Sequence, residues 1–320
     1  MQSDGLSDNA LDLSIIIVNW NTRELLRECL SSIYEQMDGH LKYEVVVVDN
    51  NSKDNSQEMV KNTFPNVLLI ANNENVGFVK ANNIGMRSSC GRNILLLNSD
   101  TKLLDGAMYE LLDYFDQHPD VGVMTGKVLN EDGSFQRPFR RFPHPLGAYM
   151  RHTFRLVVGF NTPLHRRYFM ESVDGNSYAE VDWVTGAYLF VRRELLDVDR
   201  VFDEEIFMYY EDTLLCYRVK QKGYRCMYLP IAPIIHYGGE SAKLVHAKAG
   251  FLSFRGSVYF IRATRGVYSS WLYYYSVIST WHVLAAMFGL FSFVPYEPIA
   301  NKAGLFRSLL AYSRQKGVKP

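Results

Sequence analysis

The 320-residue sequence has few cysteines, no net charge and no secretory leader pattern. Its four cysteines form no CxxC pair and have no histidine at metal-finger spacing, which argues against a disulfide framework and favours a reducing compartment. Lysine plus arginine equals aspartate plus glutamate at 34 each, so no excess charge attracts a nucleic acid, and no such partner is expected. The polar, acidic start MQSDGLSDNALD lacks the basic and apolar blocks of a signal peptide, so we expect a cytoplasmic protein.

Glycine is absent from the turn that follows the first apolar run. This turn reads NWNTRELL. A dinucleotide-binding domain has a glycine-rich turn at that point, which lets a pyrophosphate approach the backbone. The sequence therefore argues against a nicotinamide-dependent enzyme.

Strand-like and helix-like segments alternate from Leu13 to Asp100. The runs LSIIIVNW, YEVVVVDN and RNILLLNSD have strand length, and the segments between them have helical periodicity. Continuous Val, Ile and Leu runs of this kind indicate a mostly parallel sheet with helices on both faces. The sequence predicts an α/β fold that binds its ligands beyond the carboxyl ends of the strands.

Polar residues end these apolar runs. Asn19 and Asp49 follow the first two, and the stretch LLLNSDT continues into Asn98 and Asp100. Asp49 is suited to accept hydrogen bonds from a nucleoside, or else it caps a turn. Asp100 is a ligand of the type that Mg²⁺ and Mn²⁺ prefer, and its alternative role is also that of a cap.

Seven segments follow one another with ordinary spacings: SIIIVNWN, VVVVDNNSKDNS, NNENVGFVKANNIG, LLLNSDT, VTGAYLFVRREL, MYYEDTLLCYRV and IIHYGG. As an ordered set they resemble an inverting family 2 glycosyltransferase of the GT-A fold, most of all the bacterial rhamnosyltransferase-like members. The resemblance covers roughly residues 13–240. It implies a nucleotide-sugar-binding half over 13–100 and an acceptor and catalytic half over 101–240, after a flexible N-terminus of residues 1–12.

The resemblance also implies roles for single residues. Asp212 would be the general base, Glu211 would support it or bind the acceptor, and Asp100 with His236 would hold Mg²⁺ or Mn²⁺. The expected donor contacts are Val18, Asn19, Asp49, Gly77, Phe78, Asn82, Asn98 and Asp100. The expected acceptor contacts are Trp183, Gly186 and Glu211. Each assignment has a structural alternative: helix-start acids, a structural histidine, or core packing in the case of Phe78.

The chemistry of sugar transfer agrees with these roles. An acceptor hydroxyl loses its proton as it attacks, which calls for a carboxylate base, and charge grows on the leaving diphosphate. A helix start stabilises a buried carboxylate through its free N–H groups and its dipole. The chain departs from the family pattern at two positions, because Asn98 and Leu214 stand where an acid is common.

Two further segments have unusual charge. Residues 137–168 contain seven arginines and no acid, so they form either a solvated loop or an anion site for phosphates. No Lys, Arg, Asp or Glu occurs between Arg265 and Glu297, and this stretch is as long as a membrane span. Its many Tyr, Trp and Ser residues favour helices lying at a membrane surface over 241–320. A true span and a packed soluble extension are the alternatives.

The expected function is therefore transfer of a sugar onto a glycan precursor of a cell-surface polysaccharide, at the inner face of the cell membrane. The favoured donor is dTDP-L-rhamnose, and the acceptor is expected to be lipid-linked or an oligosaccharide. A UDP-hexose donor is one alternative. A sugar-nucleotide-binding or glycan-binding module without catalysis is another, suggested by the two missing acids.

Overall fold

The computed structural model describes residues 11–37, 41–104, 108–153, 163–197, 201–238, 246–290 and 297–314. The chain forms two compact units. One, called the α/β unit, comprises residues 1–140, 173–207 and 212–241, and the other, called the helical unit, comprises 141–172, 208–211 and 242–320. Two short segments before residue 240 thus cluster with the C-terminal helices. The division expected from the sequence, with a transferase domain ending at 240, stays a prediction.

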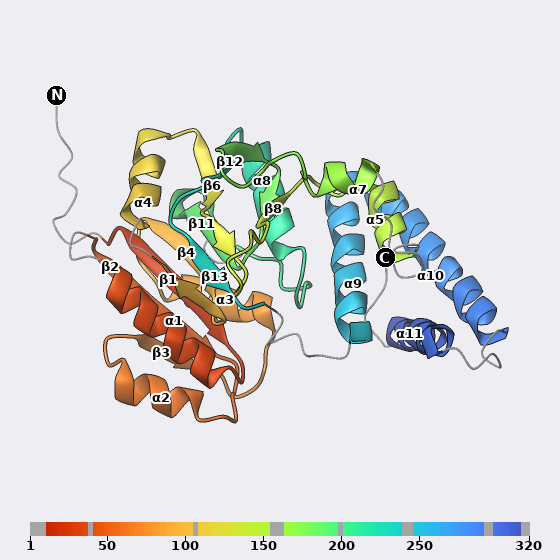
Figure 1. The fold of residues 1–320 in the computed structure, drawn as a ribbon, viewed down its shortest axis with the longest axis horizontal. Helices are drawn as coiled ribbons and strands as arrows, with labels where there is room; N and C mark the ends of the chain where they lie inside the picture. Colours follow the sequence, from red (N-terminus) through yellow and green to blue (C-terminus); the bar gives the residue numbers. More distant parts are fainter. Residues whose placement is uncertain are drawn as a thin grey trace. The chain divides into compact units, whose positions relative to one another are not determined.

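The α/β unit is built on an eight-stranded sheet (Figure 1). In spatial order its strands are β3 (Leu68–Ala71), β2 (Tyr43–Asp49), β1 (Leu13–Asn19), β4 (Asn93–Asn98), β11 (Tyr188–Arg192), β6 (Val121–Thr125), β12 (Arg225–Tyr228) and β9 (Ala179–Val181). The first four are parallel neighbours, and β12 is parallel to β6. Strand β11 is antiparallel to both β4 and β6, and β9 is antiparallel to β12. The predicted α/β fold is confirmed, with a mixed sheet because β11 is inserted between β4 and β6.

Two small sheets extend this unit. Strands β5 (Thr101–Leu103), β13 (Ile234–His236) and β7 (Val128–Leu129) form one. Strands β8 (Phe139–Arg140) and β10 (Trp183–Val184) form the other. These short strands carry His236 and Trp183, two residues of the predicted site.

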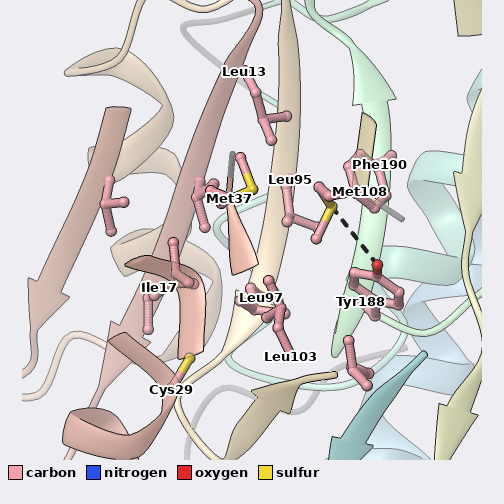
Figure 2. Close-up of a cluster of buried hydrophobic side chains, with 14 of the residues drawn as sticks. Leu13, Ile17, Cys29, Met37, Leu95, Leu97, Leu103, Met108, Tyr188 and Phe190 are labelled. Atoms are coloured by element: carbon pink, nitrogen blue, oxygen red, sulfur yellow. Dashed lines mark hydrogen bonds between the residues drawn. The ribbon is translucent and has the colours of Figure 1, made fainter. Parts of the chain in front are cut away.

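Helices cover both faces of the main sheet, which explains why its strands are apolar along their whole length. The unit's helices are α1 (Arg23–Gln36), α2 (Ser56–Thr63), α3 (Phe78–Arg87), α4 (Met108–Gln117), the 3-10 helix η1 (Arg193–Leu195) and α8 (Glu211–Gln221). Figure 2 shows the cluster on one face, where Leu95 and Leu97 lie among side chains from the sheet and its helices. On the other face α3 approaches so closely that a Cβ on Gly85 would lie 2.5 Å from Ile16 Cγ2.

The helical unit contains α5 (Pro145–His152), α7 (Pro163–Tyr168), α9 (His246–Arg265), α10 (Val267–Leu290) and α11 (Glu297–Ser313). The buried faces of α5, α9, α10 and α11 form one core that includes Phe254, Trp281 and Phe306. No helix among the described residues is long and apolar enough to cross a membrane. The alternative of a span is therefore wrong for α10; residues 291–296 and most of the expected flexible N-terminus lie outside the described residues.

Candidate active site

The carboxyl ends of β1, β2 and β4 lie at one edge of the main sheet. The parallel register pairs Asn19 with Asp49, and Val18 with Asn98. Four residues expected to contact the donor are therefore brought together at the place where such sheets bind ligands.

Asp49 is the centre of a closed hydrogen-bond network at this edge. Its Oδ2 accepts from Asn19 Nδ2 at 2.8 Å and from Ser52 Oγ at 2.6 Å, and its Oδ1 accepts from Ser52 N at 2.9 Å and Gln57 Nε2 at 2.7 Å. A carboxylate has about four acceptor sites, so these bonds use its capacity. The bond to Ser52 N makes Asp49 a turn residue as well. A nucleoside would have to exchange with one of these donors, and the nucleoside-binding role stays a prediction.

Asp100 and His236 meet although they are distant in sequence. Strand β13 pairs antiparallel with β5, which places His236 opposite Thr101, the residue after Asp100. His236 Nε2 lies 3.3 Å from Asp100 Oδ1, and the Asp100 side chain is 6% exposed. Asn98 Nδ2 lies 3.3 Å from the same ring nitrogen. The structure thus brings together the two residues expected to hold a metal.

Gln136 determines how the His236 ring is protonated. Its Nε2 donates to Asn130 Oδ1 at 2.7 Å and to the His236 carbonyl at 3.0 Å. Its Oε1 is therefore the atom that faces His236 Nδ1, at 2.6 Å, and Nδ1 must be the donor in that bond. In the neutral ring the lone pair is then on Nε2, on the side of Asp100.

This arrangement fits a divalent cation. An imidazole nitrogen and a carboxylate oxygen, two ligand types that bind divalent cations, lie 3.3 Å apart here, and the Asn98 amide lies 3.3 Å from the same nitrogen. The hydrogen bond from Nδ1 to Gln136 is the kind of support that orients histidine ligands of metals. The described residues contain no group of three or more His, Cys, Asp or Glu side chains suited to a metal. Mg²⁺ usually keeps substrate phosphates and water among its ligands.

Asp212 lies in the first turn of α8, where free backbone N–H groups are available. Its Oδ2 accepts from Gly186 N at 3.1 Å, and its Oδ1 accepts from Thr213 N at 2.6 Å and Thr213 Oγ1 at 3.1 Å. Burial raises the pKa of the Asp212 carboxyl, while these bonds and the positive charge of Arg140 partly offset the rise. A carboxylate with a raised pKa is a better proton acceptor than an exposed aspartate.

One expected acceptor residue, Gly186, contacts this carboxylate, and a second, Trp183, contacts Arg140, whose charge acts on it. A Cβ on Gly186 would lie 3.8 Å from the Phe78 ring and 3.9 Å from Asp212 Cβ, so these three residues are neighbours. Trp183 is paired with Arg140 across β8 and β10, and the Arg140 guanidinium carbon lies 5.2 Å from the centroid of the Trp183 ring. This cation–π contact joins an expected acceptor residue to the arginine that influences Asp212.

Gly77 and Asn82 have clear structural roles. Gly77 has a φ of +89°, and a Cβ there would lie 2.7 Å from the Phe207 ring, so a side chain would be strained and crowded. Asn82 is buried, and its Nδ2 donates to the Phe78 carbonyl at 2.9 Å within α3. Their expected contacts with the donor stay predictions.

Glu211 is 5% exposed and clusters with the helical unit, whereas Asp212 clusters with the α/β unit. The two residues before it, Tyr209 and Tyr210, have φ values of 71° and 75°, which bulky residues rarely adopt. Helix α9 accommodates this bend, because a Cβ on Gly256 would lie only 2.4 Å from the Tyr209 carbonyl oxygen. Glu211 as an acceptor ligand stays a prediction.

The arginine-rich run is divided between the two units. Arg137 donates to the Val173 carbonyl at 2.8 Å within the α/β unit. Arg151, in the helical unit, donates to the hydroxyls of Tyr168 and Tyr210. Arg166 and Arg167 are exposed, and residue 155 lies outside the described residues. The run therefore serves several local contacts, and an anion site formed by it stays a prediction.

Sequence reasoning missed four residues that support the site: Ser52, Gln57, Gln136 and Arg140. Ser52 belongs to the quoted segment VVVVDNNSKDNS, and Arg140 belongs to the arginine-rich run, so both had a signal. Gln57 and Gln136 had none, because their roles depend on side-chain geometry.

Comparison with known proteins gives similarity at the level of family and of fold. Residues 14–175, just over half of the chain, match the family described as glycosyl transferase family 2. Over 243 residues the chain is 26% identical to an N-acetylglucosaminyl-diphospho-decaprenol L-rhamnosyltransferase of Mycobacterium tuberculosis. That match covers 72% of this chain and 77% of the mycobacterial protein.

Two solved structures share the fold. A mannosyltransferase from Pyrobaculum calidifontis in complex with GDP-Man and Mn²⁺ has a TM-score of 0.56 at 17% identity, over 98% of this chain and 91% of that one. GalNAc-T7 with UDP, GalNAc and Mn²⁺ has a TM-score of 0.52 at 17% identity, over 72% of this chain and 44% of that one. This chain thus spans less than half the length of GalNAc-T7.

Proposed function

The chain belongs to glycosyltransferase family 2, and we propose that it transfers a sugar from a nucleotide donor to an acceptor hydroxyl with inversion at the anomeric carbon. One observation carries the proposal. Asp100 and His236, far apart in sequence, face each other at 3.3 Å beside the carboxyl edge of the sheet. The same unit holds Asp212, a partly buried carboxylate in the first turn of a helix, whose pKa is raised by burial and partly lowered by the positive charge of Arg140.

Asp212 performs the proton transfer in this proposal. Its carboxylate takes the proton of the acceptor hydroxyl while that oxygen forms a bond to the anomeric carbon. The bond from the anomeric carbon to the diphosphate oxygen breaks on the opposite face, and the nucleoside diphosphate leaves with the bonding electrons. Hydrogen bonds from Gly186 and Thr213 keep the carboxylate oriented during attack.

Asp100 and His236 would hold Mg²⁺ or Mn²⁺, and Gln136 would keep the His236 ring in the required tautomer. A bound cation supplies positive charge to the leaving diphosphate. The Mn²⁺ named for both structural relatives supports a metal-dependent enzyme.

The proposed donor is dTDP-L-rhamnose, and the proposed acceptor is a lipid-linked glycan precursor of a cell-surface polysaccharide, on the cytoplasmic side of the membrane. The name of the mycobacterial relative supports L-rhamnose as the sugar and a lipid-linked acceptor. A hexose donor carried by UDP or GDP is the alternative, favoured by the GDP-Man of the archaeal relative. The third hypothesis is a binding module without catalysis. Leu214, which stands where an acid is common in the family, is 3% exposed and belongs to the core. The presence of Asp100, Asp212 and His236 together favours an enzyme over such a module.

Thermal stabilisation by dTDP-, UDP- and GDP-sugars, each with and without Mn²⁺, tests the donor. A ligand that binds only the folded state raises stability by mass action, so the true donor should raise the melting temperature most and more with Mn²⁺. Stabilisation by dTDP-L-rhamnose above the others supports rhamnose. A larger shift with UDP- or GDP-hexoses assigns the alternative donor.

Replacement of the base tests catalysis. Asp212→Asn keeps the size of the side chain but removes proton acceptance, so turnover should fall by about 10²- to 10⁴-fold while donor binding is retained. Release of nucleoside diphosphate in the presence of extracted acceptor lipids measures turnover. Asp113→Asn, an exposed acid of α4, is the matched control and should have parental activity. Parental activity in Asp212→Asn would contradict the assignment.

A further inference from the structure

Helix α10 has two apolar faces. Its inner face, with Tyr273, Val277 and Trp281, is part of the core of the helical unit. On the opposite side eight large apolar residues, at spacings typical of one helix face, are 49% to 94% exposed. We call them the outer face of α10: Val267, Tyr268, Trp271, Leu272, Tyr275, Val283, Met287 and Leu290. Single exposed apolar residues are ordinary, but two groups of them on one helix, at residues 267–275 and 283–290, indicate a surface that contacts a partner.

The helices around this face are basic. Helix α10 has no charged residue, and α9 and α11 together contain six lysines and arginines against one acid, Glu297. Arg262 and Arg265 are exposed just before the N-terminal end of α10. At its other end Lys302 Nζ lies 5.8 Å from the centroid of the Phe288 ring, and a Cβ on Gly289 would lie 3.3 Å from an Arg307 nitrogen. Cations therefore stand at both ends of the apolar face.

An apolar helix face with cations at both ends favours one kind of partner. We infer that the outer face of α10 docks onto the surface of an anionic lipid bilayer, with its apolar side chains among the headgroups and its flanking cations on lipid phosphates. Tyrosine and tryptophan favour that depth, and basic residues beside them are attracted to anionic lipids. No described helix is suited to cross the bilayer, so α10 would lie along the surface. A second copy fits less well, because pairing two such faces in either orientation sets cations against cations.

The inference does not depend on the proposed function. It places the chain where a lipid-linked acceptor would be, but a protein that transfers no sugar would dock by the same face. Vesicle binding is therefore measured separately from turnover, and each proposal can fail without the other.

Co-sedimentation of the full chain with vesicles tests docking. Vesicles of phosphatidylcholine with phosphatidylglycerol should bind the protein, added salt should weaken binding, and phosphatidylcholine alone should bind it poorly. The double variant Tyr268→Gln with Leu272→Gln should lose about tenfold or more in affinity. Arg262→Gln with Arg265→Gln should lose about fivefold per charge. The matched control is Tyr109→Gln with Leu68→Gln, two exposed residues of the α/β unit that should not affect binding.

The fluorescence of the two α10 tryptophans reports which face is involved. Trp271 is 49% exposed and Trp281 is fully buried, so only Trp271 emission should move to shorter wavelength with vesicles. Trp271→Phe should bind vesicles without that shift. Equal vesicle binding by the parent and the Tyr268/Leu272 variant would overturn the inference. So would a parent dimer that this variant converts to a monomer in the absence of any vesicle binding, because the occupant would then be a second copy.

Discussion

The α/β unit buries aliphatic side chains between a sheet and its helices, whereas the helical unit buries aromatic side chains between helices. The first core is mainly Leu, Ile, Val and Met. Of the second core, six of thirteen members are aromatic: Phe251, Phe254, Tyr273, Tyr274, Trp281 and Phe306. Aliphatic runs pack on both faces of a strand and leave polar groups only at strand ends. Aromatic residues on α10 occupy both the core and the surface, so residue type alone does not separate the two.

The two units also differ in how their polar and apolar side chains are held. In the α/β unit the residues at the sheet edge are held by specific hydrogen bonds, such as Asn19 to Asp49 and Gln136 to His236. Such bonds fix side chains for chemistry. In the helical unit the notable feature is apolar surface without a described partner. The proposed chemistry therefore belongs to the first unit, and the proposed docking belongs to the second.

Replacing each of the two tryptophans of α10 in turn should give the largest difference in stability between two variants. Trp281 is fully buried, donates to the His152 carbonyl at 2.7 Å and packs on Phe254. Trp281→Ala should lower the free energy of unfolding of the helical unit by about 3–5 kcal/mol. Trp271→Ala, at an exposed site on the same helix, should change it by less than about 0.5 kcal/mol. Urea unfolding followed by circular dichroism measures both. Similar losses in the two variants would contradict the division of α10 into a core face and an outer face.

Substitutions at the expected metal site should change nucleotide binding, which we assign to the α/β unit, and no property of the helical unit. Asp100→Ala should remove the gain in nucleotide affinity that Mn²⁺ provides, because it deletes a ligand. Gln136→Leu should weaken Mn²⁺-dependent binding by about 10- to 100-fold, because His236 loses its orienting partner. Calorimetry of nucleotide binding with and without Mn²⁺ measures both, and vesicle binding should not change. An unchanged Mn²⁺ effect in both variants would count against the metal assignment.

Two glycines of α9 provide a matched pair in the helical unit. A Cβ on Gly256 would lie 2.4 Å from the Tyr209 carbonyl oxygen, whereas a Cβ on Gly250 would make an ordinary contact with Leu309 at 3.7 Å. Gly256→Ala should therefore cost about 1–3 kcal/mol of stability through overpacking. Gly250→Ala should gain about 0.5–1 kcal/mol, since alanine favours helices. Thermal unfolding compares them. If both variants are stabilised, the close approach at Tyr209 is wrong.

The sequence predicted the α/β unit well for a physical reason. Apolar runs such as residues 15–18 and 45–48 are long enough to identify buried strands, and parallel pairing then brings Asn19, Asp49 and Asn98 to one edge. The meeting of Asp100 and His236 was expected only from the family resemblance. The tautomer of His236 was not predictable, because it depends on the side-chain bonds of Gln136.

For the C-terminal region the sequence predicted helices but left their surroundings open. The charge-free stretch after Arg265 was compatible with a span, an interfacial helix and a packed helix, because all three need apolar residues. Trp271 and Trp281 have the same residue type and opposite burial, and only packing against Phe254 distinguishes them. The positive φ angles at Tyr209 and Tyr210 had no sequence signal, since they occur at residues that rarely adopt them.

The smallest expected effect concerns the pH dependence of the activity that we assign to the α/β unit. Burial raises the pKa of Asp212, and the Arg140 charge partly lowers it. Activity requires the carboxylate, so it should fall as the pH drops through this raised pKa. Arg140→Gln removes the positive charge, the pKa should rise further, and the acidic limb of the kcat/KM profile should move to higher pH by less than about one unit, equivalent to ~1.4 kcal/mol. At pH values well above this limb Asp212 is ionised in both proteins, so its protonation should no longer cause a difference in kcat/KM between them. Arg141→Gln, an exposed neighbour, is the control. A limb that stays in place or moves to lower pH would show that Arg140 does not act on the base.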